Sequence, residues 1–348
     1  NRGDAGRLIA TALASDRVEG TALHPMRIVT VTMARNEGDI VEAFVRHHLP
    51  WVDHMIILDH DSTDSTPAVL RELVREGLPL TVQANHSLLF QQGPMTTSLA
   101  RRAFAEFGAD FVLPIDADES LRAPSRSALE AALAAIPAAR MGRVSWQNYL
   151  CHEADDPQVL NPVARMQHRA RQEVSPQHKV VLTPAFAAAR ECALSPGNHH
   201  VLLDARGGRS VETVALEALA LAHFALRSQS QMQQKILLGW LSTRLQNPVE
   251  LPAHAAPNRQ SLFRHWHEMF GQLLRNPEID TATRQRLAWQ HYVGGGAAGA
   301  ATTQSDLVVD PLPVAYDLRY TDRASSDALT SLARWTDALL TVIGQQMR

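Results

Sequence analysis

The sequence predicts an α/β fold with a mostly parallel sheet, helices on both faces of that sheet, and a helical C-terminal extension. Two observations lead to this prediction. Short apolar or β-branched runs alternate with helical patterns over the first third of the chain, and such alternation is typical of crossover units in a parallel sheet. A chain of 348 residues, 45% of them hydrophobic and 20% charged, can form one large globular domain with an extension.

Four strands and three helices are expected before residue 120. The apolar runs predict strands at Ile28–Met33, Met55–Leu58, Leu80–Val82 and Asp110–Ile115. Between them, helical patterns cover residues 39–48, 65–76 and 95–107. Ser65 or Thr66 is the expected N-cap of the second helix, with Pro67 in its first turn.

The pattern changes after residue 125. It predicts a helix at 126–136, strands at 143–146, 178–182 and 201–203, and helices at 228–245, 260–275 and 327–347. Residues 151–177 are polar and irregular, and residues 248–257 form a proline-containing linker. Leu329, Leu332, Trp335 and Leu339 give the last helix an amphipathic spacing, which predicts packing on the main domain or, as the alternative, docking to a membrane or a partner subunit.

Composition excludes several classes of protein. The net charge of −3 gives no basic face for a nucleic-acid partner. Cys151 and Cys192 are too few for a disulfide framework or a cysteine-based zinc site, and they fit a reducing compartment. No apolar run approaches the length of a membrane span. We therefore expect a cytoplasmic protein, with peripheral contact at the inner face of the membrane as an option for the C-terminal helices.

Polar side chains follow three of the expected strands. Their positions are Asn36 and Glu37, then Asp59 to Asp64, then Asp116 to Glu119. Ligands of an open parallel sheet bind outside the carboxyl ends of its strands, so these three clusters should lie at one edge. Asp64 is expected to cap a helix or close a turn, and Asn36 and Glu37 have a turn and a cap as their alternative roles.

Asp116 and Asp118 are separated by one residue at the end of an apolar run. Alternate side chains of a strand point to the same face, so the two carboxylates should point the same way. Like charges repel unless a cation or a shared proton lies between them. Mn²⁺ or Mg²⁺ with a phosphate is the expected partner, since both ions prefer oxygen ligands, and an acidic turn is the alternative.

The order of these motifs resembles the GT-A fold glycosyltransferases, more closely their family 2-type branch. The matching segments lie within about residues 27–240 and are Ala34–Glu37, Asp59–Thr66, Ile115–Glu119, and His223–Ser228 with Lys235. The resemblance implies a Rossmann-like catalytic domain at 26–247, with a nucleotide-binding half (26–120) and an acceptor half (121–247). Residues 1–25 are then a lead-in segment, and residues 248–348 a mainly helical extension.

The resemblance also implies roles for individual residues. It assigns Asn36, Glu37, Asp59 and Asp61 to the nucleotide. It assigns Asp118 to the metal ion, with Asp116 acting there through the ribose or water. The segment Gly197–His200 resembles one in which a histidine completes the metal shell, and His200 is our choice there. Arg227 and Lys179 are candidate cations for the diphosphate. His223 ends an apolar run, and its alternative role is that of a buried, hydrogen-bonded histidine.

Family 2-type enzymes invert the anomeric centre, so a carboxylate should deprotonate the acceptor hydroxyl. Many relatives carry a Glu-Asp pair after the metal motif, but this chain has Cys151–Pro157 in that region. Asp155 or Glu153 is our hypothesis for the base, with Asp156 in the same loop and Glu119 as further candidates. An acidic surface loop is the alternative interpretation of this segment.

The expected activity is therefore metal-dependent transfer of a sugar from a nucleoside-diphosphate sugar to a glycan or lipid-linked saccharide, in bacterial-type surface polysaccharide assembly. Two alternatives remain. A sugar nucleotidyltransferase would share the sheet and the acids, but the first loop, Met33–Asp39, lacks the glycine-rich, basic cradle typical of that class. A catalytically degenerate sugar-binding module would keep the fold without turnover.

Overall fold

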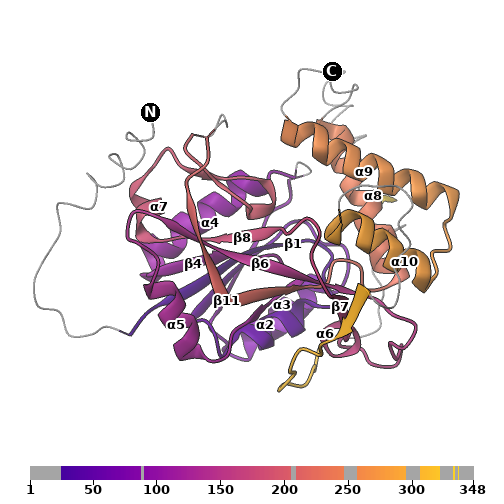
Figure 1. Cartoon of the computed structure of the whole chain (residues 1–348), viewed down its shortest axis with the longest axis horizontal. Helices are drawn as coiled ribbons and strands as arrows, with labels where there is room; N and C mark the ends of the chain where they lie inside the picture. Colours follow the sequence, from indigo (N-terminus) through magenta and orange to yellow (C-terminus); the bar gives the residue numbers. More distant parts are fainter. Residues whose placement is uncertain are drawn as a thin grey trace, which may run out of the picture.

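A computed structural model of the chain describes residues 25–87, 90–204, 209–246, 257–294 and 306–321, together with positions 332, 333 and 336. Most of the expected lead-in, residues 248–256 of the expected linker and most of the C-terminal amphipathic helix lie outside the described residues. Pro257, the last residue of the expected linker, begins a helix instead. The described part contains two large sheets, a two-stranded sheet and a group of helices (Figure 1).

The first sheet is entirely parallel, in the order β3-β2-β1-β4. Its strands are β1 (Ile28–Ala34), β2 (His54–Asp59), β3 (Leu80–Ala84) and β4 (Phe111–Pro114). Helices α2 (Val41–His48) and α3 (Thr66–Arg75) pack on one face, and α4 (Gln92–Phe107) packs on the other. The predicted fold class is confirmed.

Burial explains why these strands were predictable. Every residue of β1 is buried, because helices cover both faces of the sheet, so its sequence is a continuous apolar and β-branched run. Ile28 packs with α2 and α3, whereas Val29 and Val31 pack with α4. The β-branched side chains fit the pleated surface from both sides.

The second sheet has the order β12-β7-β6-β11-β5, with β8 also paired to β6. Its strands are β5 (Glu119–Arg122), β6 (Met141–Leu150), β7 (His168–Ala170), β8 (His178–Val181), β11 (Thr213–His223) and β12 (Leu307–Val309). A bridge between Val112 and Leu182 joins the two sheets. Pairing of β11 with β5 and β6 aligns His223 with Glu119 on one side and Asn148 on the other.

Several short elements connect these strands. They are α5 (Arg126–Ala134), α6 (Pro162–Arg165), α7 (Pro184–Ala188), β9 (Ala193–Leu194), the 3-10 turn η1 (Pro196–Asn198) and β10 (Val201–Leu202). Ser125 caps α5, since its hydroxyl accepts from the N–H of Ala128. Leu129 and Leu133 of α5 complete the core between the helices and β11.

The C-terminal helices lie together beside the second sheet (Figure 1). They are α8 (Gln229–Gln246), α9 (Pro257–Arg275), α10 (Thr281–Ala288) and the π-helical turn η2 (Trp289–Val293). Their shared core contains Met232, Ile236 and Met269 and reaches Leu150 of β6. In the part of the chain that is described, no helix has both the length and the apolar character that crossing a membrane requires.

Residues 310–321 return to the main body as an extended segment. The Asp310 carboxylate accepts hydrogen bonds from the guanidinium groups of Arg122 and Arg169. At the other end, buried Glu42 of α2 accepts from the backbone N–H groups of Arg319 and Tyr320. Two carboxylates thus fix this segment to the two sheets.

Candidate active site

The acidic motif lies in a turn between β4 and β5. Strand β4 ends at Pro114, two residues before Asp116, so the expectation that a strand aims Asp116 and Asp118 in the same direction is wrong. The turn is closed by the Glu119 N–H, which donates to the Asp116 carbonyl at 3.1 Å, and by the Asp116 N–H, which donates to the Glu119 carboxylate at 2.9 Å. As a result, Asp116 and Asp118 have separate sets of partners.

Asp116 lies beside a buried lysine. Lys179 of β8 pairs with the Asp116 carboxylate, donates to the Gly197 carbonyl at 2.8 Å, and lies 3.3 Å from Glu119. Gln92 at the start of α4 donates to Asp116 at 2.9 Å and accepts from the Gly197 N–H. Although burial opposes its charge, the carboxylates of Asp116 and Glu119 hold the pKa of Lys179 above its ordinary value.

Asp118 lies among three nitrogen-bearing side chains. Lys235 of α8 donates to its carboxylate at 2.7 Å, and Arg227 and His223 have nitrogens 3.8 and 3.9 Å away. Only 6% of the Asp118 side chain is exposed. Burial alone would raise the pKa of Asp118, but Lys235 and the other two neighbours hold it well below its usual range.

A hydrogen-bond network determines the tautomer of His223. The Asn148 amide nitrogen donates to Glu173 at 2.7 Å and to the Tyr292 carbonyl at 3.0 Å, which fixes the orientation of that amide. The Asn148 oxygen therefore faces His223 Nδ1 at 2.7 Å and accepts its proton. Burial lowers the pKa of His223 to about 3, so the ring is neutral and its unprotonated Nε2 faces Asp118.

Asp118, Glu119 and His223 form the one group of the described residues whose ligand atoms could hold a metal ion, since these atoms lie within 4.8 Å of one another. All three are buried, and burial raises the pKa of Glu119 to about 8. Trp146 of β6 stacks on the His223 ring at 4.0 Å and faces Lys179. The group combines carboxylate oxygens with one imidazole nitrogen, a donor set that suits Mn²⁺.

Arg227 joins the motif after β1 to the acidic turn. Its guanidinium pairs with Glu37, donates two hydrogen bonds of 2.8 Å to Asp39, and lies 3.8 Å from Asp118. Arg227 is 2% exposed, so its charge lies inside the site rather than on a solvated helix face. Burial raises the pKa of Glu37 to about 7 even though Arg227 opposes that shift.

Asn36 and Asp64 hold the loops at this edge together through hydrogen bonds to the backbone. Asn36 has a left-handed backbone, and its side-chain oxygen accepts from the Thr63 N–H at 2.7 Å, which joins the loops after β1 and β2. The Ser62 hydroxyl accepts from the Asn36 N–H at 2.9 Å. Asp64 accepts from the Thr66 N–H at the start of α3, as its predicted capping role requires. The clusters after β1, β2 and β4 therefore meet at one edge, as predicted.

Asp59 and Asp61 follow β2 at the same edge. Asp59 accepts from the Ser62 N–H at 3.3 Å, and burial raises the pKa of its carboxyl group. Asp61 has a left-handed backbone (φ 56°) and pairs at 3.0 Å with His86, whose side chain is 74% exposed. Asp61 is thus the member of this cluster that pairs with an exposed side chain.

The candidate bases of the loop 151–157 lie outside the metal-ligand group, whereas Glu119, the remaining candidate, belongs to it. Asp155 accepts from the His152 N–H at 2.8 Å, and burial raises the pKa of its carboxyl group. Its charge acts on Arg165, which donates to the Arg227 carbonyl at 3.2 Å, so the Asp155 loop lies on the Arg227 side of the site. Glu153, two residues earlier in the chain, is exposed.

His200 also lies outside the metal-ligand group. It is exposed, and its N–H donates to the Ser195 hydroxyl at 3.0 Å. In the described residues the histidine that lies beside Asp118, 3.9 Å away, is His223 rather than His200. Asn148, the partner of His223, and Gln92, the partner of Asp116, were not identified from the sequence. The available signal was the apolar run that ends at His223, and this run does not by itself indicate a strand, because alanine and leucine are strong helix formers.

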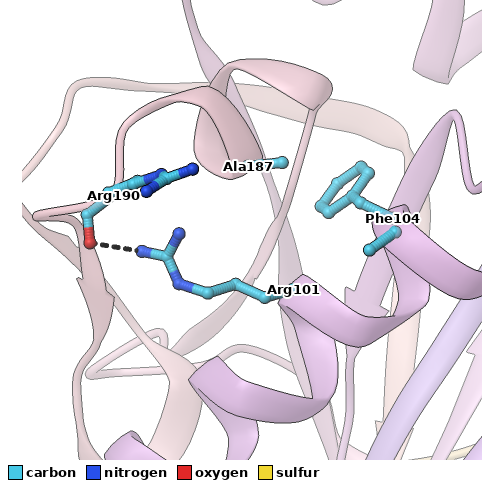
Figure 2. A pocket seen from close by; sticks show the side chains of 5 residues that line it. Arg101, Phe104, Ala187 and Arg190 are labelled. Atoms are coloured by element: carbon cyan, nitrogen blue, oxygen red, sulfur yellow. Dashed lines mark hydrogen bonds between the residues drawn. The ribbon is translucent and has the colours of Figure 1, made fainter.

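Two cavities lie elsewhere on the surface. Figure 2 shows one of about 560 Å³, lined by Arg101 and Phe104 of α4 and by Ala187 and Arg190 near α7. The Arg101 guanidinium donates to the carbonyls of Arg190 (2.8 Å) and Cys192 (2.7 Å), so it supplies donors to the backbone carbonyl groups that follow α7. A second cleft, of about 660 Å³, is lined by residues of β5, β6, β7 and β11 and by Glu173, which follows β7.

No protein-family model matches the chain, and no curated protein matches it. Among solved structures, S. aureus TarS is similar at a TM-score of 0.32 and 12% identity, over 76% of this chain and 78% of that one. A mycobacterial protein is similar at a TM-score of 0.33 and 16% identity, over 72% of this chain and 80% of that one. A mannose-1-phosphate geranyltransferase from Thermus thermophilus is similar at a TM-score of 0.24 and 12% identity, over 71% of this chain and 65% of that one. Likenesses this distant assign no function.

Proposed function

We propose that the chain is a GT-A-type, metal-dependent glycosyltransferase. It moves a sugar from a nucleoside-diphosphate sugar to a glycan or glycoconjugate acceptor, with inversion at the anomeric carbon, in bacterial-type surface polysaccharide assembly. Asp118, Glu119 and His223 would hold Mn²⁺ or Mg²⁺, in place of the set of Asp118, Asp116 and His200 expected from sequence. The protein is cytoplasmic in this proposal, and a lipid-linked acceptor would bring it to the inner face of the membrane.

The observation that carries the proposal is the contact between His223 Nε2 and Asp118. The two atoms lie 3.9 Å apart, and neither bears a proton, because His223 Nδ1 holds the ring proton and Asp118 is ionised. A neutral imidazole nitrogen and a carboxylate oxygen are both acceptors, so a cation between them would serve both. Lys235 partly supplies that charge at 2.7 Å from Asp118, and a divalent ion would supply it more completely.

The donor diphosphate would meet three buried or half-buried cations. Lys179, Arg227 and Lys235 come from different elements and surround the acidic turn. When bound, the metal ion would act as a Lewis acid for the leaving nucleoside diphosphate. Because the three cations are held in place before the reaction, they can stabilise the negative charge that develops on the leaving group.

The nucleotide would lie at the carboxyl ends of β1 and β2. Asp59 and Asp61 can accept hydrogen bonds from a base N–H or a ribose hydroxyl, and Asp61 lies beside exposed His86. Asn36 would position this loop through Thr63 rather than contact the base. Glu37 would orient Arg227, its ion-pair partner, towards the diphosphate.

Asp155 is our proposed general base, with Glu153 as the alternative. Burial raises the pKa of Asp155, which makes that carboxylate a stronger proton acceptor from a sugar hydroxyl. Asp156 is a matched control, because it is exposed and accepts a hydrogen bond from Gln158 within the same loop. Asp155→Asn should lose transfer while it keeps donor binding, and Asp156→Asn should keep both. Full transfer in Asp155→Asn would exclude it as the base.

Thermal unfolding with a panel of nucleotide sugars, with and without Mn²⁺, tests the function. A ligand that binds only the native state raises the melting temperature, by mass action. We expect one nucleotide sugar to stabilise the protein only with Mn²⁺, and its products to be nucleoside diphosphate and a glycoside or free sugar. Products of nucleoside triphosphate and sugar 1-phosphate would indicate a nucleotidyltransferase instead. Binding with no turnover on any acceptor would indicate a degenerate sugar-binding module.

A further inference from the structure

We infer that Glu173 is a positioning residue that acts through Asn148 to fix the tautomer of His223 and keep its Nε2 available to a metal ion. The inference rests on the proposed metal site. Its first readout is the tautomer in the metal-free protein, which is measurable whether or not the chain proves to be a glycosyltransferase.

Glu173 binds a single residue with both of its carboxylate oxygens. Oε1 accepts from the Asn148 backbone N–H at 2.7 Å, and Oε2 accepts from the Asn148 side-chain amide at 2.7 Å. Asn148 is 3% exposed and lies on β6, whereas Glu173 follows β7 and lines the 660 Å³ cleft. The carboxylate therefore faces inward to Asn148 from the cleft wall.

Only an acceptor fits this position. Asn148 presents two donors to Glu173, the backbone N–H and the amide nitrogen, and a carboxylate is acceptor-only. With the amide nitrogen turned towards Glu173 and the Tyr292 carbonyl, the amide oxygen has one direction left, towards His223 Nδ1. His223 must then donate from Nδ1, and its Nε2 keeps a lone pair on the side of Asp118.

A neutral amide at position 173 weakens this order. In Glu173→Gln, the new side-chain oxygen can accept from the Asn148 N–H, but the new NH₂ would meet the Asn148 NH₂. If the Asn148 amide turns over to accept from it, the Asn148 oxygen faces the Tyr292 carbonyl and the Asn148 NH₂ faces His223 Nδ1. Neither orientation satisfies every neighbour, so both become populated, and in the turned-over state His223 carries its proton on Nε2, which then cannot bind a metal ion.

A double variant that combines Asn148→Asp with Glu173→Gln should restore the proton to His223 Nδ1, because the carboxylate then stands at position 148 instead of position 173. The carboxylate introduced at position 148 can accept from His223 Nδ1–H and, at the same time, from the amide introduced at position 173. This rescue separates positioning from simple loss of packing, because the double variant changes more of the structure than either single change. Metal ligands whose outer partners are removed lose about 10- to 100-fold in affinity.

The experiment is ¹⁵N NMR of the histidine rings in the metal-free protein, with the His223 signals assigned by their absence in His223→Gln. Wild type should show Nδ1–H, Glu173→Gln should show an added population with Nε2–H, and the double variant should return to Nδ1–H. Mn²⁺ titration should follow the same order, with a dissociation constant about 10- to 100-fold weaker in Glu173→Gln and restored in the double variant. Glu217→Gln, at an exposed carboxylate of the same cleft, is the matched control and should match wild type.

Two results would overturn the inference: Nε2–H in wild type, or Nδ1–H as the sole tautomer in Glu173→Gln. If Glu173→Gln unfolds, the wild-type spectrum still shows whether His223 carries its proton on Nδ1, as the inference requires, or on Nε2. If wild type shows the expected tautomer and binds no Mn²⁺, the proposed function fails while the role of Glu173 in setting the tautomer stands. If wild type binds Mn²⁺ and Glu173→Gln binds it equally well, the metal site stands and the positioning role fails.

Discussion

Glu42→Gln should destabilise the fold strongly, although the change replaces one atom. Glu42 lies on α2 with a fully buried side chain. One carboxylate oxygen accepts from the N–H groups of Tyr320 and Thr321 and from the Thr321 hydroxyl, at 2.7 to 3.0 Å. The other accepts from the Arg319 N–H at 2.7 Å and from Arg46 Nε at 2.9 Å. Glutamine keeps one acceptor oxygen and places an NH₂ where the other stood.

The cost follows from the contacts that glutamine cannot make. In its better orientation, it keeps the oxygen that serves Tyr320 and Thr321 and turns its NH₂ towards the donors of Arg319 and Arg46. Two hydrogen bonds to a charged acceptor are lost, each worth about 1.5–3 kcal/mol. The buried donors of Arg319 and Arg46 are then left facing the NH₂ of the glutamine. We expect a loss of about 3–5 kcal/mol in the free energy of unfolding, a large part of the 5–15 kcal/mol typical of a native domain.

Urea unfolding at pH 7 measures this loss, and Glu72→Gln is the matched control. Glu72 makes an exposed ion pair with Arg75, with side chains 39% and 69% exposed, so its amide variant should change stability by less than about 1 kcal/mol. If Glu42→Gln lost no more stability than Glu72→Gln, the segment 319–321 would not be held by this carboxylate. Burial alone would raise the pKa of Glu42, but the hydrogen bonds from Arg319 and its neighbours lower it, so wild type should lose this contribution as pH falls below about 4.5.

Three further changes test other parts of the structure. Lys235→Met removes a positive charge next to the metal-ligand group, so Mn²⁺ titration should give several-fold tighter binding while sugar transfer falls; weaker Mn²⁺ binding would contradict the proposed site. Asn36→Ala removes the acceptor of the Thr63 N–H and should cost about 1–3 kcal/mol in urea unfolding, whereas an unchanged midpoint would mean that the loops are joined otherwise. The Arg122 hydrogen bonds lower the pKa of Asp310 to about 2, so wild type should lose stability as pH falls from about 4 to 2, a loss that unfolding curves of Asp310→Asn should lack.

The four strands of the first sheet were predictable because burial on both faces selects continuous β-branched runs, and β1 and β2 show this most clearly. Strand β11 was missed. Residues 213–223 are rich in alanine and leucine, which are strong helix formers, and only the pairing with β5 and β6 makes them a strand. Strand β5 was missed for a related reason, since four residues with three polar side chains carry no period.

The residues of the candidate site were likewise predictable only in part. Asp118 and the acids after β1 and β2 were predictable, because they follow strands that the local pattern reveals. His223 as a metal-site residue was not, because its position depends on the register of β11 against Asn148. Lys179 was noted as a candidate cation for the diphosphate, but its ion pair with Asp116 depends on the antiparallel pairing of β8 with β6, which no local signal encodes.

The measurement that tests the central claim most directly is titration of Mn²⁺ into wild type and three single variants. We expect wild type to bind one equivalent, Asp118→Asn and His223→Gln to lose most of that affinity, and His200→Gln to bind as wild type does. This pattern would assign the metal site to the buried group at the end of β11. Retained binding in His223→Gln, or loss of binding in His200→Gln, would contradict the account.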